Sequence, residues 1–355
     1  MTEQNNKYEV IALMSGTSLD GVDLCYSTYY KNDFWNYNIH YTETFKYPES
    51  LFNSLKNAIN IIAEELLELD VKLSKYFSKI IKSFIQKNNI QKIDFIASHG
   101  HTVFHQPNKK FTLQIGCGAT LATKTNIKVI NDFRTKDVSL GGQGAPLVPI
   151  GDQLLFPEYD YCLNLGGIAN ISYKENGNRF AFDICPINMG LNYITRKHFN
   201  LEYDKNGELA KTGKINQKLF ENLNNLEFYK INPPKSLGYE WFEHTFLPLF
   251  NKSELNPKDI LATLIEHAAI QISNSVKSNA KVLITGGGAY NKYFISRLSA
   301  ISRANLIIPN NQTVEFKEAL IFGFLGVLRD RNEINCLSTV TGAKRDSSGG
   351  VIHLP

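Results

Sequence analysis

Two glycine-bearing segments, Ser15–Asp23 and Asn164–Ser172, carry the residue types that best suit phosphate binding. Each lies between two apolar runs, so each is predicted to be the turn of a β-hairpin. Glycine lets a backbone N–H approach a phosphate without an intervening Cβ, and successive N–H groups form an anion nest. The hydroxyls of Ser15, Thr17 and Ser18 would add donors. Such hairpins are also common as ordinary turns, so it is their repetition that favours phosphate binding.

A third glycine turn, formed by Gly286, Gly287 and Gly288, follows the apolar run Lys281–Thr285. Its lack of side chains would let a nucleotide base or ribose lie flat. In the first turn, Asp20 could hold a magnesium ion through water. The chain has neither a Walker A loop nor the Rossmann glycine pattern, which disfavours those two nucleotide-binding folds.

Asp183 is the candidate catalytic residue. It ends the predicted strand Phe180–Ile184, directly after the second hairpin. A carboxylate there would point into a cleft near the transferred phosphate, where it could accept a proton from the attacking nucleophile. The alternative is that Asp183 caps a helix that begins near Pro186.

The histidines of the segment 98–105 are candidate substrate contacts. On a strand, His99 and His101 would share one face, an arrangement that metal hydrolases also use. No companion carboxylate or histidine group with ligand spacing lies nearby in the sequence, so polar contacts to a substrate are favoured over a metal site.

Arg134 follows another predicted strand and offers a planar fork to a substrate carboxylate. A surface ion pair with Asp132 or Asp137 is an equally good interpretation of the residue types alone.

Strand and helix patterns place these residues in two similar halves of an α/β protein. Apolar runs predict strands at 8–14, 22–30, 93–98, 111–115 and 127–131, and again at 161–165, 168–173, 180–184 and 281–285. Helical spacing predicts two helices within 48–86, a short helix after Gly116, and helices at 259–276, 293–300 and 315–329. Ligands of open α/β sheets bind at the ends of strands, which is where the candidate residues fall.

Composition limits the classes of function. A chain of 355 residues with 43% hydrophobic residues is expected to form two lobes. The net charge of +4 is spread over 38 basic and 34 acidic residues, so no nucleic-acid partner is expected. Five scattered cysteines indicate free thiols, and neither a secretory signal nor a membrane span is recognisable, so we expect a cytoplasmic protein without a membrane partner.

Taken together, the motifs resemble those of the anhydro-N-acetylmuramic acid kinase family from Met14 to about Val351. The segments that carry the resemblance are MSGTSLDGVD at 14–23, HGHTVFH at 99–105, DFR at 132–134, GGQGAPLVP at 141–149, NLGGIAN at 164–170 and GGG at 286–288. The first and fourth are specific enough to identify the family nearly alone.

The resemblance implies a two-lobed actin-like and hexokinase-like ATPase fold with an ATP cleft between the lobes. The expected lobes are residues 1–133, with the first phosphate hairpin and the sugar-contacting strands, and residues 134–355, with the second hairpin, the catalytic aspartate and the adenosine-binding glycines. A homodimer is also implied. The residues implied to bind ATP are Gly16, Thr17, Ser18, Leu19, Asp20, Gly21, Val22, Asp23, Gly166, Gly167, Gly286, Gly287 and Gly288.

The resemblance also implies the chemistry. Asp183 would deprotonate a water that attacks the anomeric carbon of the anhydro sugar, and the released O6 would attack the γ-phosphate of ATP with magnesium present. His99, Arg134 and Glu318 fall where the family contacts its sugar. The product would be N-acetylmuramic acid 6-phosphate, an intermediate of peptidoglycan recycling.

Three segments depart from the family pattern. Ile184, Cys185 and Ile187 replace small residues after Asp183 and are expected to reshape the floor of the cleft, His101 replaces a glutamine, and Leu237 replaces a threonine. These departures leave open a kinase of the same fold for a different sugar. A non-catalytic nucleotide-driven clamp would also use the glycine hairpins, and a metal-dependent hydrolase could be built on His99 and His101.

Overall fold

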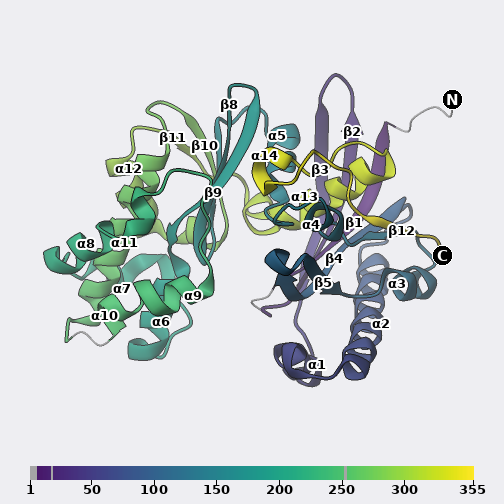
Figure 1. The fold of residues 1–355 in the computed structure, drawn as a ribbon, viewed down its shortest axis with the longest axis horizontal. Coiled ribbons are helices and arrows are strands. Elements are labelled where there is room, and N and C mark those ends of the chain that lie inside the picture. The colour runs from purple at the N-terminus through teal and green to yellow at the C-terminus, as the bar shows by residue number, and fades with distance from the viewer. Residues whose placement is uncertain (1–5, 17–18, 252–253) are drawn as a thin grey trace. The chain divides into compact units, whose positions relative to one another are not determined.

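The computed structural model describes residues 6–16, 19–251 and 254–355. These residues form two compact units (Figure 1). The first unit comprises the residues up to Phe156 together with Phe316–Pro355, and the second is the continuous stretch Pro157–Glu315. This division differs from the lobe boundary expected between residues 133 and 134, since residues 134–156 and 316–355 belong to the first unit.

The C-terminal part of the chain packs in the first unit because its apolar side chains complete that unit's core. Phe322 and Phe324 of α13 (Asn311–Asp330) are fully buried. The hydroxyl of Tyr29 donates a hydrogen bond of 2.6 Å to the carbonyl of Leu320. In Figure 1 these yellow segments lie among the purple and blue elements of the first unit.

The first unit is built on a seven-stranded mixed sheet with the order β12-β6-β4-β1-β2-β3, and β5 pairs with β4 outside this path. β1 pairs antiparallel with β2 and parallel with β4. The strands are β1 Lys7–Ser15, β2 Val22–Lys31, β3 Trp35–Phe45, β4 Phe95–Gln106, β5 Phe111–Ile115, β6 Val129–Asn131 and β12 Val351–His353.

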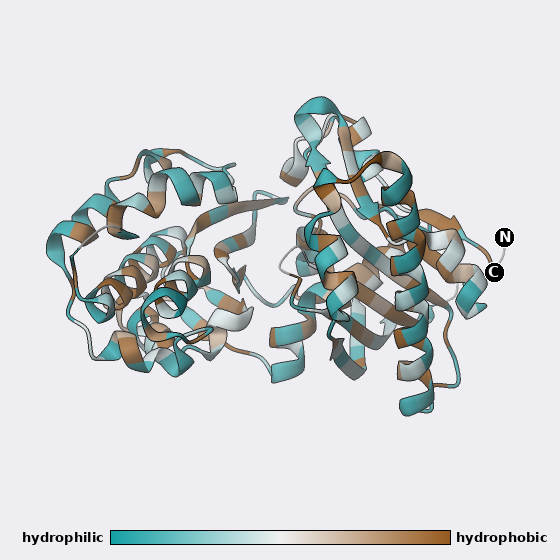
Figure 2. Cartoon of the chain, turned by 90° about the horizontal axis from the view of Figure 1, so that it is seen from below, coloured by the Kyte–Doolittle hydropathy of each residue, from teal (hydrophilic) through white to brown (hydrophobic). Residues whose placement is uncertain are grey.

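Helix α2 shows why helices cover this sheet. Its buried apolar residues, among them Leu69, Leu73, Phe77 and Phe84, recur at intervals that place them on one face. Figure 2 shows hydrophobic and hydrophilic bands along such helices. The helices of the unit are α1 Glu49–Lys56, η1 Ala58–Asn60, α2 Ala63–Lys87, η2 Pro107–Lys109, α3 Gly118–Thr125, α4 Thr135–Ser139, α5 Val148–Leu155, most of α13, and α14 Ser338–Thr341.

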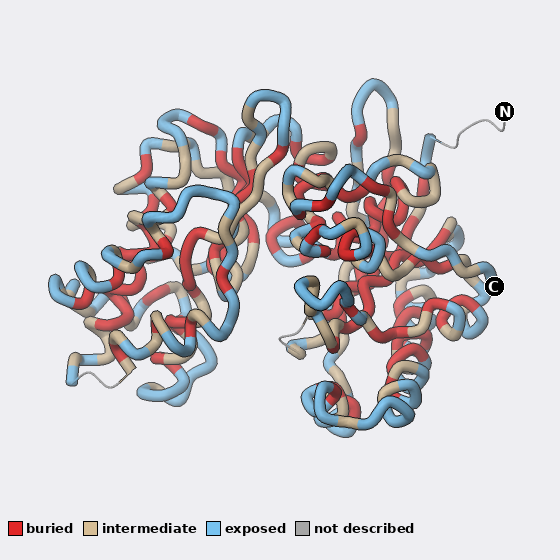
Figure 3. The backbone as a smooth tube through the Cα atoms, in the orientation of Figure 1, coloured by how far each residue is buried: buried red, intermediate tan, exposed pale blue. Residues whose placement is uncertain are grey.

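The second unit has a five-stranded sheet with the order β11-β10-β7-β8-β9. Its strands are β7 Tyr161–Leu165, β8 Ile168–Glu175, β9 Asn178–Pro186, β10 Lys281–Thr285 and β11 Asn305–Ile307. Its helices and turns are α6 Asn188–Phe199, η3 Lys205–Gly207, α7 Glu208–Lys211, α8 Gln217–Asn224, η4 Glu227–Lys230, α9 Tyr239–Trp241, η5 Phe242–Phe246, α10 Pro248–Asn251, α11 Pro257–Ser275, η6 Gly287–Tyr290 and α12 Lys292–Ile301. Buried residues, red in Figure 3, follow the strands and α11.

The two sheets share one topology. In each, the first strand (β1 or β7) begins an antiparallel run of three strands on one side and pairs with a parallel strand (β4 or β10) on the other. This repetition confirms the predicted α/β fold with two similar halves. It also places the two predicted phosphate turns at equivalent positions, each directly after the first strand of its sheet. Among the described residues, no helix has the length and apolar character needed to cross a bilayer.

Candidate active site

The first predicted phosphate turn joins β1 to β2 in the first unit. Thr17 and Ser18 lie outside the described residues. Gly16 and Leu19 are partly exposed, Asp20 is exposed, and Leu19 has a positive φ of 60°. A Cβ on Gly21 would lie 2.8 Å from a methyl group of Thr44 and 2.9 Å from the carbonyl oxygen of Phe45, so only glycine fits there.

Val22 and Asp23 begin β2 and are held by the sheet. The Val22 side chain is fully buried in the core. The Oδ1 atom of Asp23 accepts a hydrogen bond of 2.6 Å from the hydroxyl of Thr44 on β3. The described groups of this segment that are exposed or half-exposed are therefore those of Gly16, Leu19, Asp20, Gly21 and Asp23.

Ser15 links this turn to the histidine segment. It is fully buried at the end of β1, beside His101 of β4. Its Oγ lies 2.6 Å from the hydroxyl of Tyr47 and 3.1 Å from Nδ1 of His101. Tyr47 was not predicted as a site residue, and its position 32 residues away in the chain provides no sequence signal for this contact. The predicted phosphate donor is thus a buried anchor of the turn.

His99 and Arg134 form a pair in the first unit. Nε and Nη2 of Arg134 lie 3.1 and 2.9 Å from Nε2 of His99. Because a guanidinium can only donate, Nε2 must be the unprotonated nitrogen, and Nδ1–H then donates to the carbonyl of Gly100 at 2.9 Å. Both side chains pack against the ring of Phe322. The ring centroids of His99 and Phe322 are 4.7 Å apart, and Cζ of Arg134 lies 5.6 Å from the Phe322 centroid.

The remaining contacts of Arg134 test its interpretation as the partner of an ion pair. Nη1 donates to the carbonyl of Gly144 at 2.7 Å. Asp132 accepts instead from the backbone N–H of Thr135, and Asp137 accepts from the N–H of Gly144. The structure therefore holds Arg134 through neutral acceptors and an aromatic ring, which corrects the interpretation as an ion pair with Asp132 or Asp137.

Glu318, the third predicted sugar contact, is exposed on α13. Its carboxylate acts on Arg134 electrostatically and raises the pKa of the guanidinium, while burial lowers that pKa by more. His99, Arg134 and Glu318 are thus brought together in one unit, with Phe322 as an additional partner.

His99 and His101 stay neutral at physiological pH. Burial lowers the pKa of His99 to about 3, with a contribution from the charge of Arg134, and lowers that of His101 to about 4. They bond to different groups, Arg134 and Ser15, instead of facing one ligand. Within the described part of the chain, no group of three histidine, cysteine, aspartate or glutamate residues could hold a metal.

We expect His101→Gln to reduce the acid sensitivity of folding. The unfolded chain binds a proton on this histidine below the ordinary pKa of 6.5, and the folded protein does so only near 4. His101 should therefore lower the free energy of unfolding by about 2 kcal/mol between pH 8 and pH 5. Urea unfolding at both pH values should show a smaller difference for the variant than for the wild type. An identical difference would mean that the proton binds equally in both states.

The second phosphate turn, Gly166–Gly167, lies between β7 and β8 in the second unit. The carbonyl of Gly167 accepts from the backbone N–H groups of Ile187 and Met189, at 2.8 and 3.1 Å. The side-chain amide of Asn188 donates to the carbonyl of Leu165 at 3.0 Å. The turn is therefore fixed to the start of α6 by its carbonyls.

The third glycine turn follows β10. Gly286 has φ of 82°, and a Cβ there would collide with Oδ1 of Asn164. A Cβ on Gly288 would lie 2.8 Å from that of Leu165. Gly287 differs, because a Cβ there would meet none of the described atoms within 4 Å. Two of the glycines allow close packing against β7, and the middle one faces open space.

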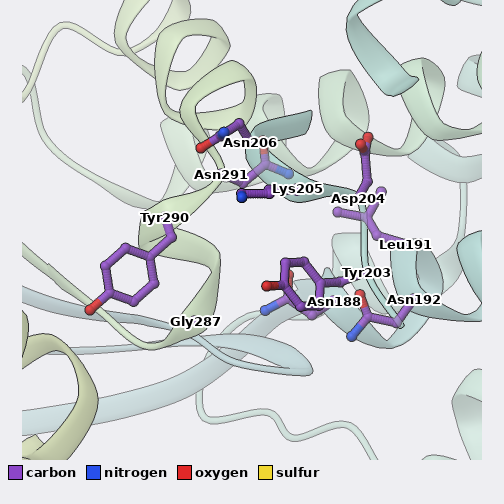
Figure 4. Close-up of a pocket in the computed structure, with 10 residues that line it drawn as sticks. All are labelled: Asn188, Leu191, Asn192, Tyr203, Asp204, Lys205, Asn206, Gly287, Tyr290 and Asn291. Atoms are coloured by element: carbon purple, nitrogen blue, oxygen red, sulfur yellow. The ribbon is translucent and has the colours of Figure 1, made fainter. Parts of the chain in front are cut away.

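A cavity of about 390 Å³ adjoins Gly287 within the second unit (Figure 4). It is large enough for a nucleoside. Its lining is mostly amide, phenol and charged side chains, and apart from Gly287 none of them was predicted as a site residue. The lining residues are Asn188, Leu191, Asn192, Tyr203, Asp204, Lys205, Asn206, Gly287, Tyr290 and Asn291.

Asp183 lies within β9 and is half-buried. Its Oδ2 accepts a hydrogen bond of 2.8 Å from the backbone N–H of Leu237, and its own N–H donates to the carbonyl of Lys235 at 3.0 Å. Oδ1 accepts no hydrogen bond from the residues that the structure describes. Burial raises the pKa of the carboxyl group, and the Leu237 N–H opposes this rise. The geometry suits a general base with one oxygen fixed.

The interpretation of Asp183 as a helix cap is wrong. Helix α6 begins at Asn188 with Ile187 in the capping position. The three residues after Asp183 that depart from the family pattern also lie in a different environment from the one expected. Ile184, Cys185 and Ile187 are between 0 and 3% exposed and belong to the hydrophobic core of the second unit. They fill the core and do not form the floor of an open cleft.

The chain is similar to known proteins along almost its whole length. The sequence matches the family described as anhydro-N-acetylmuramic acid kinase over residues 8–355. An anhydro-N-acetylmuramic acid kinase of Haemophilus influenzae is 35% identical, covering 96% of this chain and 97% of that protein. One of Sulfurovum sp. is 34% identical, covering 98% and 100%. Among solved structures, an activator of 2-hydroxyisocaproyl-CoA dehydratase from Clostridium difficile is 13% identical, covers 91% of this chain and 97% of that one, and has a TM-score of 0.43.

The duplicated sheet topology and the paired glycine turns define a two-lobed α/β protein of the actin-like and hexokinase-like class. The chain belongs to the anhydro-N-acetylmuramic acid kinase family. This membership confirms the predicted family and the predicted class of enzyme, an ATP-dependent sugar kinase.

Proposed function

We propose that the protein opens the 1,6-anhydro ring of anhydro-N-acetylmuramic acid and phosphorylates O6 with ATP, giving N-acetylmuramic acid 6-phosphate and ADP. The family match over residues 8–355 carries this proposal. An anhydro bridge leaves no free 6-hydroxyl, so ring opening and phosphoryl transfer must be coupled. The reaction would serve the recycling of peptidoglycan.

In the proposed reaction, Asp183 acts as the general base. Its carboxylate takes a proton from water, the water oxygen bonds to C1, and the C1–O6 bond breaks. The O6 electron pair attacks the γ-phosphorus, and the bond to the β-phosphate oxygen breaks to release ADP. The hydrogen bond from Leu237 to Oδ2 supports this role, since it fixes the carboxylate while Oδ1 remains able to accept the proton.

We assign recognition of the sugar to His99, Arg134 and Glu318. His99 and Gly144 take three of the five N–H groups of Arg134, which leaves two on the end of the fork for a carboxylate. Muramic acid carries a lactyl carboxylate that fits this geometry. The exposed Glu318 carboxylate would accept from sugar hydroxyls.

We assign the nucleotide to the glycine turns and to the cavity beside Gly287. The first and second turns would donate backbone N–H groups to phosphates. The cavity would take adenosine, with amide side chains such as Asn192 and Asn206 available to its polar edges.

Magnesium binding is proposed at Asp20. In phosphate-transferring sites, Mg²⁺ usually keeps several waters and is held by one or two carboxylates together with the phosphates, and an exposed carboxylate beside a phosphate turn fits this mode. When bound, the ion would neutralise charge on the phosphates.

The test measures ADP release with ATP and magnesium, comparing the anhydro sugar with N-acetylmuramic acid, N-acetylglucosamine and glucose. We expect turnover of the anhydro sugar and a 6-phosphate product. In ¹⁸O-water the label should enter at C1 and be absent from the phosphate ester. Turnover of another sugar alone would favour a same-fold kinase for that sugar, and no turnover of any sugar would favour the nucleotide-driven clamp.

We expect Gly287→Val to raise the KM for ATP by about tenfold, which corresponds to about 1.4 kcal/mol of binding. Its side chain would enter the open space at the cavity without disturbing the fold. Gly286→Ala is the matched control, since its clash with Asn164 and its positive φ should lower the melting temperature instead. An unchanged KM in a folded Gly287→Val protein would contradict the placement of the nucleotide.

We propose that the protein is a homodimer and is located in the cytoplasm. No disulfide bond joins the five cysteines, all of which lie within the described residues, in keeping with a reducing compartment; they are Cys25, Cys117, Cys162, Cys185 and Cys336.

A further inference from the structure

The segment 231–238 holds Asp183 through backbone atoms, although most of the segment is exposed. It joins η4 to α9 in the second unit. Most of the segment is exposed, namely residues 231–234, Ser236 and Gly238. The side chain of Lys235 is half-buried, and that of Leu237 is buried. Lys235 and Leu237 are therefore the side chains that attach the segment to the protein.

Lys235 reaches back to η4. Its Nζ donates to the carbonyl of Phe228 at 3.1 Å and lies 4.6 Å from the centre of the Phe228 ring. The two contacts come from the same residue, so the ammonium is held both by a hydrogen bond and by a cation–π interaction. Burial lowers the pKa of Lys235, and the nearby thiol of Cys185 opposes this.

Phe228 is itself a fixed point. It is 7% exposed and its ring packs against Tyr229 and Trp241, with centroid distances of 5.6 and 5.4 Å. The Tyr229 hydroxyl lies 2.9 Å from Nε2 of His267, which is fully buried on α11. Lys235 thus ties a segment that has little burial of its own to the core of the unit.

We propose that Lys235 is a positioning residue for Asp183, because its attachment to Phe228 holds the segment so that the N–H of Leu237 donates to Oδ2. This inference rests on the proposed role of Asp183 as the base. The carbonyl of Lys235 accepts from the N–H of Asp183 at 3.0 Å, and only Ser236 separates Lys235 from Leu237, so a shift of the lysine would be transmitted directly to the donor. Lys235 would contribute through geometry, without contact to the reacting atoms.

The proposal predicts a change in the pH profile. The base must be ionised to work, and the Leu237 N–H favours the ionised form. Loosening the segment would therefore raise the pKa of Asp183 further and move the acid limb of kcat/KM to higher pH. Burial and the Leu237 N–H are the causes of the shift in the pKa of Asp183, and no charged side chain of the described residues contributes to it.

The experiment compares Lys235→Met and Lys235→Arg with the wild type and with Lys230→Met. Lys230 is a matched control, because it lies just before the segment and pairs with Glu227 in solvent. Lys235→Met should lower kcat about tenfold, leave the KM for ATP unchanged and raise the acid limb by about half to one pH unit. Lys235→Arg should restore most of the loss, and Lys230→Met should match the wild type.

Hydrogen exchange of the peptide covering 231–238 gives a second readout that needs no substrate. Lys235→Met should increase exchange at Leu237 by about tenfold. Unchanged exchange and an unchanged acid limb, with Asp183→Asn inactive, would overturn the positioning role alone. A wild type that fails to turn over the anhydro sugar would overturn the proposed function, and the exchange result would still decide whether Lys235 holds the segment.

Discussion

Asp183→Asn should lower kcat by about 10²- to 10⁴-fold, the usual cost of removing a general base. Asparagine has nearly the same shape and can still accept from the N–H of Leu237, so the local structure should persist. It cannot take up a proton from water, so ring opening should fail at its first step. Single-turnover and steady-state ADP release would both measure the loss.

The activity of the wild type should fall as the pH is lowered through the pKa of Asp183. Burial raises the pKa of Asp183, so the wild type should lose activity at a higher pH than an ordinary carboxylate would require. The residual activity of Asp183→Asn should lack this acid limb. Asp33→Asn is a suitable control, because Asp33 is exposed in the turn between β2 and β3. Near-wild-type turnover by a folded Asp183→Asn protein would exclude this residue as the base.

Arg134→Lys should raise the KM for anhydro-N-acetylmuramic acid by about 10- to 100-fold, with a smaller effect on kcat. Lysine keeps the positive charge but loses the planar fork that His99 and Gly144 orient. The comparison substrate is 1,6-anhydro-N-acetylglucosamine, which lacks the lactyl carboxylate. The wild type should use it poorly, and Arg134→Lys should lose little further activity on it.

The two substrates distinguish a role of Arg134 in recognising the lactyl carboxylate from a role in supporting the fold. Arg303→Lys is the control for the substitution itself, because Arg303 is exposed in the second unit. If Arg134→Lys reduces activity equally on both sugars, the arginine supports the fold around His99 and Phe322 and does not recognise the carboxylate.

The regular elements could be predicted because their signals are local. Apolar runs predicted β1, β2 and β7–β10, and helical spacing predicted α2, α11 and α13. Strand β3 (Trp35–Phe45) was not predicted, because most of its side chains are polar or aromatic and at least partly exposed, and it lies at the edge of the sheet. The extent of β4 was also underestimated, since the histidine segment continues the strand beyond Ser98.

The candidate site was predictable as a set of residue types but not as a set of contacts. Asp183 and Arg134 could be selected because each lies near or after the end of a predicted strand, although β9 continues beyond Asp183 to Pro186. Their partners could not, because Leu237 lies 54 residues from Asp183, and Phe322 comes from a helix near the end of the chain. The lobe boundary failed for the same reason, since long-range packing and not composition assigns residues 316–355 to the first unit.

The split first unit also bears on synthesis. The second unit is one continuous stretch with its own core, so it can fold as soon as residues 157–315 have left the ribosome. The first unit begins to emerge earlier, but its folding cannot be completed until residues 316–355 have been synthesised. Only then can β12 pair with β6, and only then can the hydroxyl of Tyr29 donate to the carbonyl of Leu320. The nascent strands β1–β6 therefore pass through translation with part of their sheet uncovered. The half of the enzyme that is made first is the half that is completed last.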